Sequence, residues 1–376
     1  MNAERGMTSV ARPGLLARCR RYWFLIGLCL LAVPMLVQLA ELQEAASEEE
    51  ARTLSPLPAW PHSLAQWNAL PRELDRFVVD HFGFRAQLVR AHAALRYAVV
   101  LPTDLRVLIG RDGFLFLNGD GTIEQATGQV LREPAIQKFA DRAADLQKRL
   151  AAKNARLLVA IPPNGSTINR SRLPAWAATQ PAVSEYDLMM QALAARGVAA
   201  VDLRPPLLSA NANHPTYRRT DTHWNKLGAL VAYNRVVEAL RQPDWTIDPT
   251  RVLRGFETAP GGDLARLLAV SASVTDEDAV IDLSPYRPTA LVTKPIDTQF
   301  ESGGDFVETG RNGPTVVVIG DSFTRGFWQD YFGLHAGKYV WMHHELCSFA
   351  VSVVEREAPD IVILAPAERQ MFCFGK

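Results

Sequence analysis

The amino-acid sequence predicts an α/β protein in which a mostly parallel sheet is flanked by helices. From residue 135 onward, amphipathic helical patterns alternate with short apolar runs, as in strands joined by crossover helices. The run at residues 315–319 is apolar throughout, which is typical of a strand covered on both faces. The 376 residues are 48% hydrophobic and 21% charged, enough for one large domain with an appendage. The formal net charge is zero, so the charge balance does not indicate a nucleic-acid partner.

A segment near the N-terminus predicts a single transmembrane helix, an uncleaved signal-anchor over residues 23–40. Gln38 is its only strongly polar residue, and the run is just long enough to cross a hydrocarbon core. Residues 1–22 form a basic tail, which its arginines predict to stay in the cytoplasm. A cleaved signal peptide is the alternative, and in either case the rest of the chain is exported. Residues 41–62, acidic and then proline-bearing, predict a linker to a domain at 63–376.

Periodicity predicts the order of the elements in that domain. Helical spacing of apolar residues predicts helices over 63–100, the second of them at 85–97. Two apolar runs across Asp112-Gly113 predict a hairpin over 107–117. The segment at 254–313 is expected to be irregular and inserted. The other predicted helices lie at 135–153, 184–197, 221–240 and 349–356 and directly after 319, and the strands at 155–161, 198–202, 315–319, 339–343 and 361–365.

Gly320, Asp321 and Ser322 follow one of these predicted strands. In parallel sheets, functional sites form at the C-terminal ends of strands, which is where this serine lies. A helix is expected to start at or just after Ser322, so that its first amides and its dipole favour an oxyanion. The backbone N–H of Ser322 is a further candidate donor. The alternative is that the tripeptide is only a strand-to-helix turn with an N-cap.

His223 and Asp221 supply the groups that would activate such a serine. A serine hydroxyl needs a base to take its proton, and histidine is suited to this near neutral pH. The base needs a carboxylate on its other ring nitrogen, and Asp221 lies two residues before His223. Asp221 could instead cap the following helix, or do both. Together the residues predict acyl transfer, with Ser322 as nucleophile, His223 as base and Asp221 as the orienting carboxylate.

The cysteines and histidines indicate a disulfide more than a metal site. Cys347 and Cys373 would lie in an oxidising compartment, where they can pair; two buried free thiols are the alternative. Cys19 and Cys29 lie in or beside the predicted anchor. The adjacent histidines at 343–344 should point to opposite faces of their strand, so no metal or other cofactor is expected.

Two sequence blocks resemble those of the SGNH hydrolases, in reversed order. Gly320-Asp321-Ser322 resembles the first block of that family and Asp221-x-His223 the last, which implies a circularly permuted sheet. This order is similar to that of the alginate O-acetyltransferase family of exported polysaccharide-modifying proteins. Unlike ordinary SGNH enzymes, the chain has no asparagine after the strand at 361–364 to donate to an oxyanion. Further blocks that resemble the acetyltransferase family lie at 80–85, 110–116, 220–224, 261–264 and 359–362.

The resemblance implies an O-acetyltransferase in the periplasm, attached to the inner membrane. Ser322 would carry the acetyl group, and His223 would activate the hydroxyl of an exopolysaccharide, alginate-like or other, that receives it. A membrane-bound O-acyltransferase would supply the acetyl groups. An acetyl esterase needs the same residues and differs only in using water as acceptor. A non-catalytic subunit of a polysaccharide-secretion complex is a third reading, which the intact set of three residues argues against.

The second oxyanion donor has several candidates. Arg325 and Arg369 are the charged ones, since both follow strands that end at the predicted site. Trp224 and Tyr217 are further candidates for oxyanion or substrate contacts. For Arg369 the alternative is a salt bridge to Glu368 or to another surface acid.

Overall fold

The computed structural model describes residues 22–39, 54–101, 104–286, 291–296, 303–349 and 351–373. The chain divides into two compact units, residues 1–92 and 93–376, whereas the expected domain began at residue 63. The helical periodicity near residues 63–100 is confirmed by two helices, α4 (Leu64–Asp80) and α5 (Arg85–Ala98). Ser63 caps α4, because its hydroxyl accepts a hydrogen bond from the backbone of Gln66.

The predicted membrane span is not supported. The apolar segment does form a helix, α2 (Trp23–Leu39), which has 17 residues and contains Pro34. Among the described residues, no helix combines the length and the apolarity that a membrane crossing requires. Residues 1–21 of the predicted tail and 41–53 of the predicted linker lie outside the described residues.

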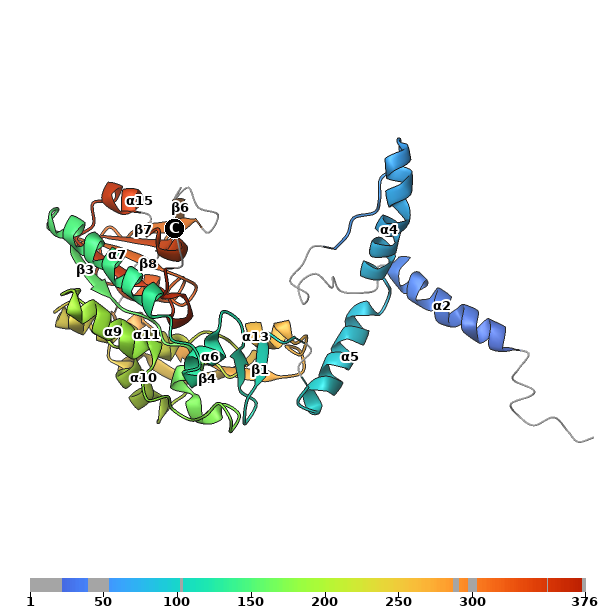
Figure 1. Ribbon diagram of the computed structural model, residues 1–376, viewed down its shortest axis with the longest axis horizontal. Coiled ribbons are helices and arrows are strands. Elements are labelled where there is room, and N and C mark those ends of the chain that lie inside the picture. The colour runs from blue at the N-terminus through green and yellow to red at the C-terminus, as the bar shows by residue number, and fades with distance from the viewer. Residues whose placement is uncertain are drawn as a thin grey trace, which may run out of the picture. The chain divides into compact units, whose positions relative to one another are not determined.

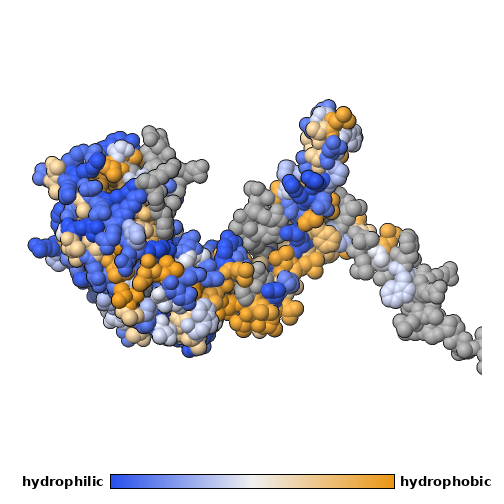
Figure 2. Space-filling view, viewed as in Figure 1, coloured by the Kyte–Doolittle hydropathy of each residue, from blue (hydrophilic) through white to orange (hydrophobic). Residues whose placement is uncertain are grey.

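Helix α5 has one buried and one exposed face. Ala86 and Ala93, seven residues apart, are 6% and 2% exposed. Leu88 and Leu95, also seven residues apart, are 57% and 67% exposed. Apolar residues are visible over this helix in Figure 2, whereas the visible face of the second unit is mostly hydrophilic.

The second unit is built on a six-stranded sheet with the order β3-β10-β8-β9-β7-β6. The first four strands of this order pair in parallel, whereas β7 and β6 pair antiparallel. The expected mostly parallel sheet is therefore confirmed only in part, because the sheet is mixed. Both antiparallel strands come from the segment expected to be irregular. The expected strand at 198–202 forms only an isolated bridge between Val159 and Ala200. The strands are β3 (Arg156–Val159), β6 (Lys294–Ile296), β7 (Gly304–Glu308), β8 (Thr315–Gly320), β9 (Lys338–His343) and β10 (Ile361–Ala365).

Helices cover both faces of this sheet (Figure 1), which explains why β8 is apolar throughout. Val317 and Ile319 pack with residues of α7, α9 and α15 on one face. Val316 and Val318 pack with residues of α10, α11 and α14 on the other, as the two-residue period of a strand requires. These helices are α7 (Glu133–Ala151), α9 (Glu185–Ala195), α10 (Arg204–Asn211), α11 (Lys226–Ala239), α14 (Trp328–Phe332) and α15 (Val351–Arg356).

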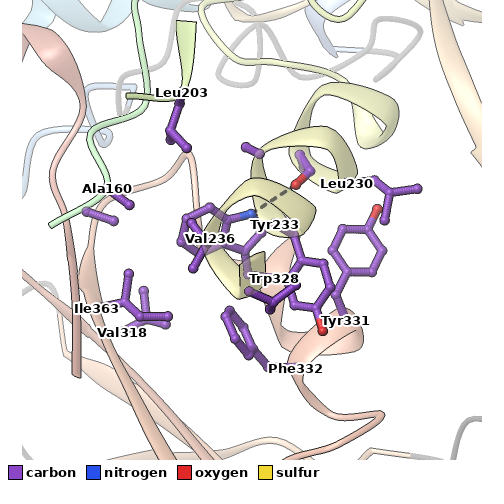
Figure 3. Packing of buried hydrophobic residues seen from close by; sticks show 14 of the residues in the cluster. Ala160, Leu203, Leu230, Tyr233, Val236, Val318, Trp328, Tyr331, Phe332 and Ile363 are labelled. Carbon is purple, nitrogen blue, oxygen red and sulfur yellow. Dashed lines mark hydrogen bonds between the residues drawn. The ribbon is translucent and has the colours of Figure 1, made fainter. Parts of the chain in front are cut away.

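An aromatic cluster joins α11 to α14 in the core on one face of the sheet (Figure 3). Trp328 is fully buried, and its indole N–H donates to the carbonyl of Ala229 over 3.1 Å. The ring of Tyr233 packs edge-on against that of Phe332, with 4.8 Å between the ring centroids. Because buried aromatic rings contribute large apolar areas, this cluster gives the segment after β8 a rigid support.

The described parts of the segment at 254–313 form regular elements, contrary to the expectation that it is irregular. Its strands β4 (Leu253–Pro260) and β5 (Thr275–Ile281) pair antiparallel, with α13 (Asp263–Leu267) between them. Three acidic residues in β5 lower its intrinsic strand propensity, which hides the strand in the sequence. The predicted hairpin near residues 107–117 is confirmed as β1 (Val107–Ile109) and β2 (Leu115–Leu117). Shorter helices are α6 (Thr122–Thr127), α8 (Gly165–Ile168) and α12 (Pro249–Val252), with 3-10 turns at Arg170–Arg172, Pro243–Trp245, Ser284–Tyr286, Glu345–Cys347 and Glu368–Gln370.

Cys347 and Cys373 form a disulfide with a Cα–Cα distance of 5.6 Å. Both cysteines are buried in the core beside α7. The bond links the segment after β9 to the segment after β10. Cys29 is an exposed free cysteine, and Cys19 lies outside the described residues.

Replacing both cysteines, Cys347→Ser with Cys373→Ser, should lower the free energy of unfolding by about 3 kcal/mol, since the bond restricts the unfolded chain. Thermal unfolding with and without reductant measures this, and reduction should destabilise the wild type but not the double variant. Cys29→Ser is the matched control and should leave the Tm unchanged. An unchanged Tm in the double variant would show that the bond is absent in solution.

Candidate active site

A tight turn after β8 exposes Ser322. Asp321 is buried, and its two carboxylate oxygens accept from the backbone N–H of Phe323 (2.9 Å) and of Ala367 (2.7 Å), the second of which follows β10. At Gly320 a Cβ atom would lie 2.3 Å from the hydroxyl oxygen of Thr324, so only glycine fits. The turn is therefore fixed on both sides of Ser322, whose own side chain stays exposed.

The helix expected to begin at Ser322 begins later. Turns fill the chain after Ser322, and α14 starts only at Trp328 and has five residues. The predicted contribution of a helix dipole at the serine is therefore wrong. The backbone N–H of Ser322 donates to no acceptor among the described residues, so it is free to donate to an oxyanion.

His223 lies in a loop whose ends, Tyr217 and Trp224, are joined by an antiparallel bridge. The carboxylate of Asp276, on β5, accepts from the backbone N–H of Arg219 (3.0 Å) and of Thr220 (2.8 Å) and from the Thr220 hydroxyl (2.6 Å). The inserted β4–β5 segment therefore holds this loop in place. We refer to residues 217–224 as the histidine loop.

Ser322, His223 and Asp221 are brought together as the sequence predicts. His223 Nε2 lies 2.8 Å from Ser322 Oγ, and His223 Nδ1 lies 2.7 Å from Asp221 Oδ1. Thr222 Oγ1 is also 3.2 Å from Nδ1. Since its own proton goes to Asp263, it too faces the ring as an acceptor. Acceptors around Nδ1 require that this nitrogen carries the proton, which leaves Nε2 free to accept the proton of Ser322.

A second carboxylate, that of Asp263, lies close to Asp221 and His223. It accepts from the Thr222 hydroxyl (2.5 Å) and backbone N–H (2.8 Å), and one of its oxygens is 3.7 Å from His223 Nδ1. Its own N–H donates to Asp221 over 3.2 Å. At the preceding Gly262 a Cβ atom would lie 2.5 Å from Asp221, so a glycine is needed there. Sequence reasoning missed the role of Asp263, although the Gly-Gly-Asp block that contains it was the available signal.

The pKa values of Asp221 and Asp263 are shifted in opposite directions. Burial alone would raise the pKa of Asp221, but the hydrogen bond to His223 and the charge of that residue lower the pKa well below its ordinary value. Burial raises the pKa of Asp263, and the negative charge of Asp221 raises it further. The ionised form is thus favoured at Asp221, which bonds the imidazole directly, more than at Asp263.

Trp224 and Tyr217, the further candidates for oxyanion or substrate contacts, are both buried. Trp224 is fully buried and its indole N–H donates to the carbonyl of Phe323 over 2.8 Å, which ties the histidine loop to the serine turn. Tyr217 is 2% exposed, and its hydroxyl donates to the carbonyl of Pro163 over 2.5 Å. Both side chains therefore hold the site together, and the Tyr217 ring also lines a cavity beside the loop.

The two arginine candidates for the oxyanion donor, Arg325 and Arg369, differ in their partners. Arg325 is paired with Asp305 at 2.9 Å and stacks on Trp341. The guanidinium of Arg369 lies 5.1 Å from the centre of the Phe323 ring, and within the described ranges it makes no salt bridge. The alternative pairing with Glu368 is wrong, because that buried carboxylate accepts from the backbone of Asn164 and from Thr167. Arg369 and Asp221 line a small cavity of about 20 Å³ beside the histidine loop.

The same groups could be considered as metal ligands. One oxygen or nitrogen from each of Asp221, His223 and Asp263 lies within 4.8 Å of the other two. These atoms are already hydrogen-bonded to one another or to Thr222, so a cation would have to replace those bonds. The histidines at 343–344, expected on opposite faces, instead stack with centroids 4.5 Å apart, because β9 ends at the first of them.

Comparison of the sequence with known proteins finds a matching family. The family described as "SGNH hydrolase-like domain, acetyltransferase AlgX" matches residues 107–335. A protein of Pseudomonas aeruginosa named probable alginate O-acetylase AlgJ is 27% identical over 250 residues, which cover 62% of this chain and 59% of that protein. The Pseudomonas putida protein of that name is 28% identical over 233 residues, 60% of this chain and 57% of the relative. This chain thus spans less than two thirds of the length of these relatives.

A solved structure supports the fold. The structure of Bacillus cereus PatB1 superimposes with a TM-score of 0.52 at 14% identity, covering 72% of this chain and 97% of that chain. At this identity the likeness concerns the fold alone.

Asp263→Asn should separate the effect of this carboxylate on activity from its effect on stability. Because the pKa of Asp263 is raised in the fold, its ionised form destabilises the protein above that pKa, and the neutral amide should not lower the Tm at pH 7. Hydrolysis of a small acetyl ester should slow about tenfold, since Thr222 and the imidazole lose a charged acceptor.

Asp221→Asn is the matched control. Its pKa is lowered in the fold, so the ionised group stabilises the protein above its unfolded pKa, and this contribution is lost as the pH falls through the folded pKa. This variant should have a lower Tm at pH 7, and its rate of ester hydrolysis should fall about 10³–10⁴-fold. Equal losses of rate in the two variants, or a lower Tm for Asp263→Asn, would contradict the assigned roles.

Proposed function

This chain belongs to the family of AlgX-type SGNH hydrolase-like acetyltransferase domains, and from this premise we propose that it is an O-acetyltransferase for an exported polysaccharide. The observation that carries the proposal is the hydrogen-bonded series from Asp221 through His223 to the exposed Ser322. The names of its relatives point to alginate as one acceptor, and another exopolysaccharide with free hydroxyls would fit the same chemistry.

The proposed reaction has two halves. In the first, Ser322 Oγ gives its proton to His223 Nε2 and attacks the carbonyl carbon of an acetyl donor. The tetrahedral intermediate collapses, the donor's leaving group takes the proton from His223, and the acetyl group remains on Ser322. In the second, a sugar hydroxyl gives its proton to His223 and attacks the acetyl carbon, after which Ser322 Oγ leaves and recovers the proton. Asp221 stabilises the imidazolium in both halves.

The oxyanion of each intermediate needs two donors. The free N–H of Ser322 is the first, and Arg369 is the second, because its guanidinium lies at the serine turn without a carboxylate partner in the described chain. A charged donor aimed at a developing negative charge lowers the barrier more than a neutral one.

The proposed location is the periplasm. Arginines precede the N-terminal apolar segment, and the Cys347–Cys373 disulfide fits an oxidising compartment. The segment at 23–40 would hold the protein at the inner membrane, and a membrane-bound O-acyltransferase would supply the acetyl groups.

The proposal is tested with full-length protein, 4-nitrophenyl acetate and an oligosaccharide acceptor. Acetylated oligosaccharide should form and the release of nitrophenolate should accelerate, because the sugar intercepts the acetyl-enzyme. Ser322→Ala should reduce both by at least about 10³-fold, whereas the exposed Ser273→Ala control should reduce neither. Release of nitrophenolate that no glycan accelerates would identify an esterase, and an unchanged rate in Ser322→Ala would end the catalytic assignment.

The two arginines should respond differently to substitution. Arg369→Gln should lower kcat about 10²–10³-fold through loss of an oxyanion donor. Arg325→Gln, which breaks a half-exposed ion pair with Asp305, should change kcat less than about threefold. Steady-state rates with the small ester measure both, and the reverse ranking would place the oxyanion at Arg325.

A further inference from the structure

We propose that a cavity of about 480 Å³ beside the histidine loop binds a run of hydroxyl-rich sugar units of the acceptor chain. The inference rests on the proposed function, because it names where the glycan lies when one of its hydroxyls reaches Ser322. The walls come from the hairpin β1–β2, the loop after α10 and the strand β5. The lining includes Phe114, Asn169, Asn213, His214, Arg219 and Glu277.

The cavity lies near the reacting residues, because one of its lining residues is close to His223 in the sequence. Arg219 lines the cavity and lies four residues before His223, so their Cα atoms are at most about 14 Å apart. The backbone of Arg219 is fixed on both sides, since its carbonyl accepts from Leu115 of β2 (2.7 Å) and its N–H donates to Asp276 of β5 (3.0 Å). A polymer held in the cavity therefore needs only a few further units to reach Ser322.

The polar lining suits sugar hydroxyls, which donate and accept hydrogen bonds at once. The amide of Asn213 and the imidazole of His214 are exposed and can do both. His214 is held by its ring contact with Phe256 of β4, at 5.6 Å between centroids. Asn169 also lines the cavity and accepts at Oδ1 from Asn211 over 3.0 Å, which fixes the orientation of its amide. Phe114 adds an apolar wall for the C–H face of a sugar ring.

The positive and negative side chains that line the cavity are equal in number. Two arginines and two carboxylates line the cavity, namely Arg172, Arg219, Asp276 and Glu277. Arg172 is paired with Asp112, and Asp276 is occupied by the bonds that hold the histidine loop. The cavity therefore recognises hydroxyl groups more than charge, and binding should change little with salt, unlike binding that depends on exposed charges.

The test measures binding separately from chemistry, in full-length Ser322→Ala protein. The probes are cellohexaose, a neutral hexamer, and a mannuronate hexamer, an acidic one, titrated by calorimetry at low and high salt. Adding Asn213→Ala and His214→Ala should weaken binding of the better hexamer about tenfold, the loss of one or two hydrogen bonds. Gln180→Ala, an exposed amide outside the cavity, is the matched control and should leave the affinity unchanged.

Each result decides the inference. Binding that the double substitution does not weaken, binding that high salt abolishes, or no binding of either hexamer would overturn it. With an intact Ser322, the double substitution should raise KM for the hexamer but leave hydrolysis of 4-nitrophenyl acetate unchanged. If the hexamer binds in the cavity but is never acetylated, the proposed function fails and the binding site stands.

Discussion

The position of His223 depends on the hydrogen bonds that hold the histidine loop between the inserted segment and the serine turn. Asp276 and Asp263, both from the insertion, accept from the backbone and hydroxyl groups of the loop. Trp224 then ties the loop to the turn by its bond to the carbonyl of Phe323. The 2.8 Å contact between His223 and Ser322 joins residues 99 positions apart, so no local preference can set it. A loosened loop would leave the sheet folded and still separate base from nucleophile, which is costly in rate.

Because Asp263 helps to hold the loop, two carboxylates, those of Asp221 and Asp263, lie near the imidazole of His223. Their environments differ, because the pKa of Asp221 is lowered by its bonds to His223 while burial and a like charge raise that of Asp263. Asp221 therefore fixes the tautomer directly, and Asp263 acts through Thr222. As the imidazole takes up a proton, both carboxylates favour the positive charge that forms.

The sequence predicted what local patterns and block order encode and missed what long-range contacts decide. Ser322 could be placed because the apolar strand before it and Gly320 mark the end of a buried parallel strand. The antiparallel strands β6 and β7 could not, since their residues come from a segment without a clear period. The start of the helix after Ser322 was also missed: Asp321 is committed to Phe323 and Ala367 and so prolongs the turn. Asp263 and Asp276 gain their roles only from the fold that brings them to the histidine loop.

The central claim is that Ser322 carries the acetyl group between donor and acceptor. Rapid mixing of the full-length protein with an acetyl donor, acid quenching and peptide mass spectrometry test it most directly. The mass of one acetyl group should appear on the peptide that contains Ser322 before product forms, and it should disappear when an oligosaccharide is added. Acetylated product formed without any acetylated Ser322, or an acetyl group on another residue that turns over at the same rate, would contradict it.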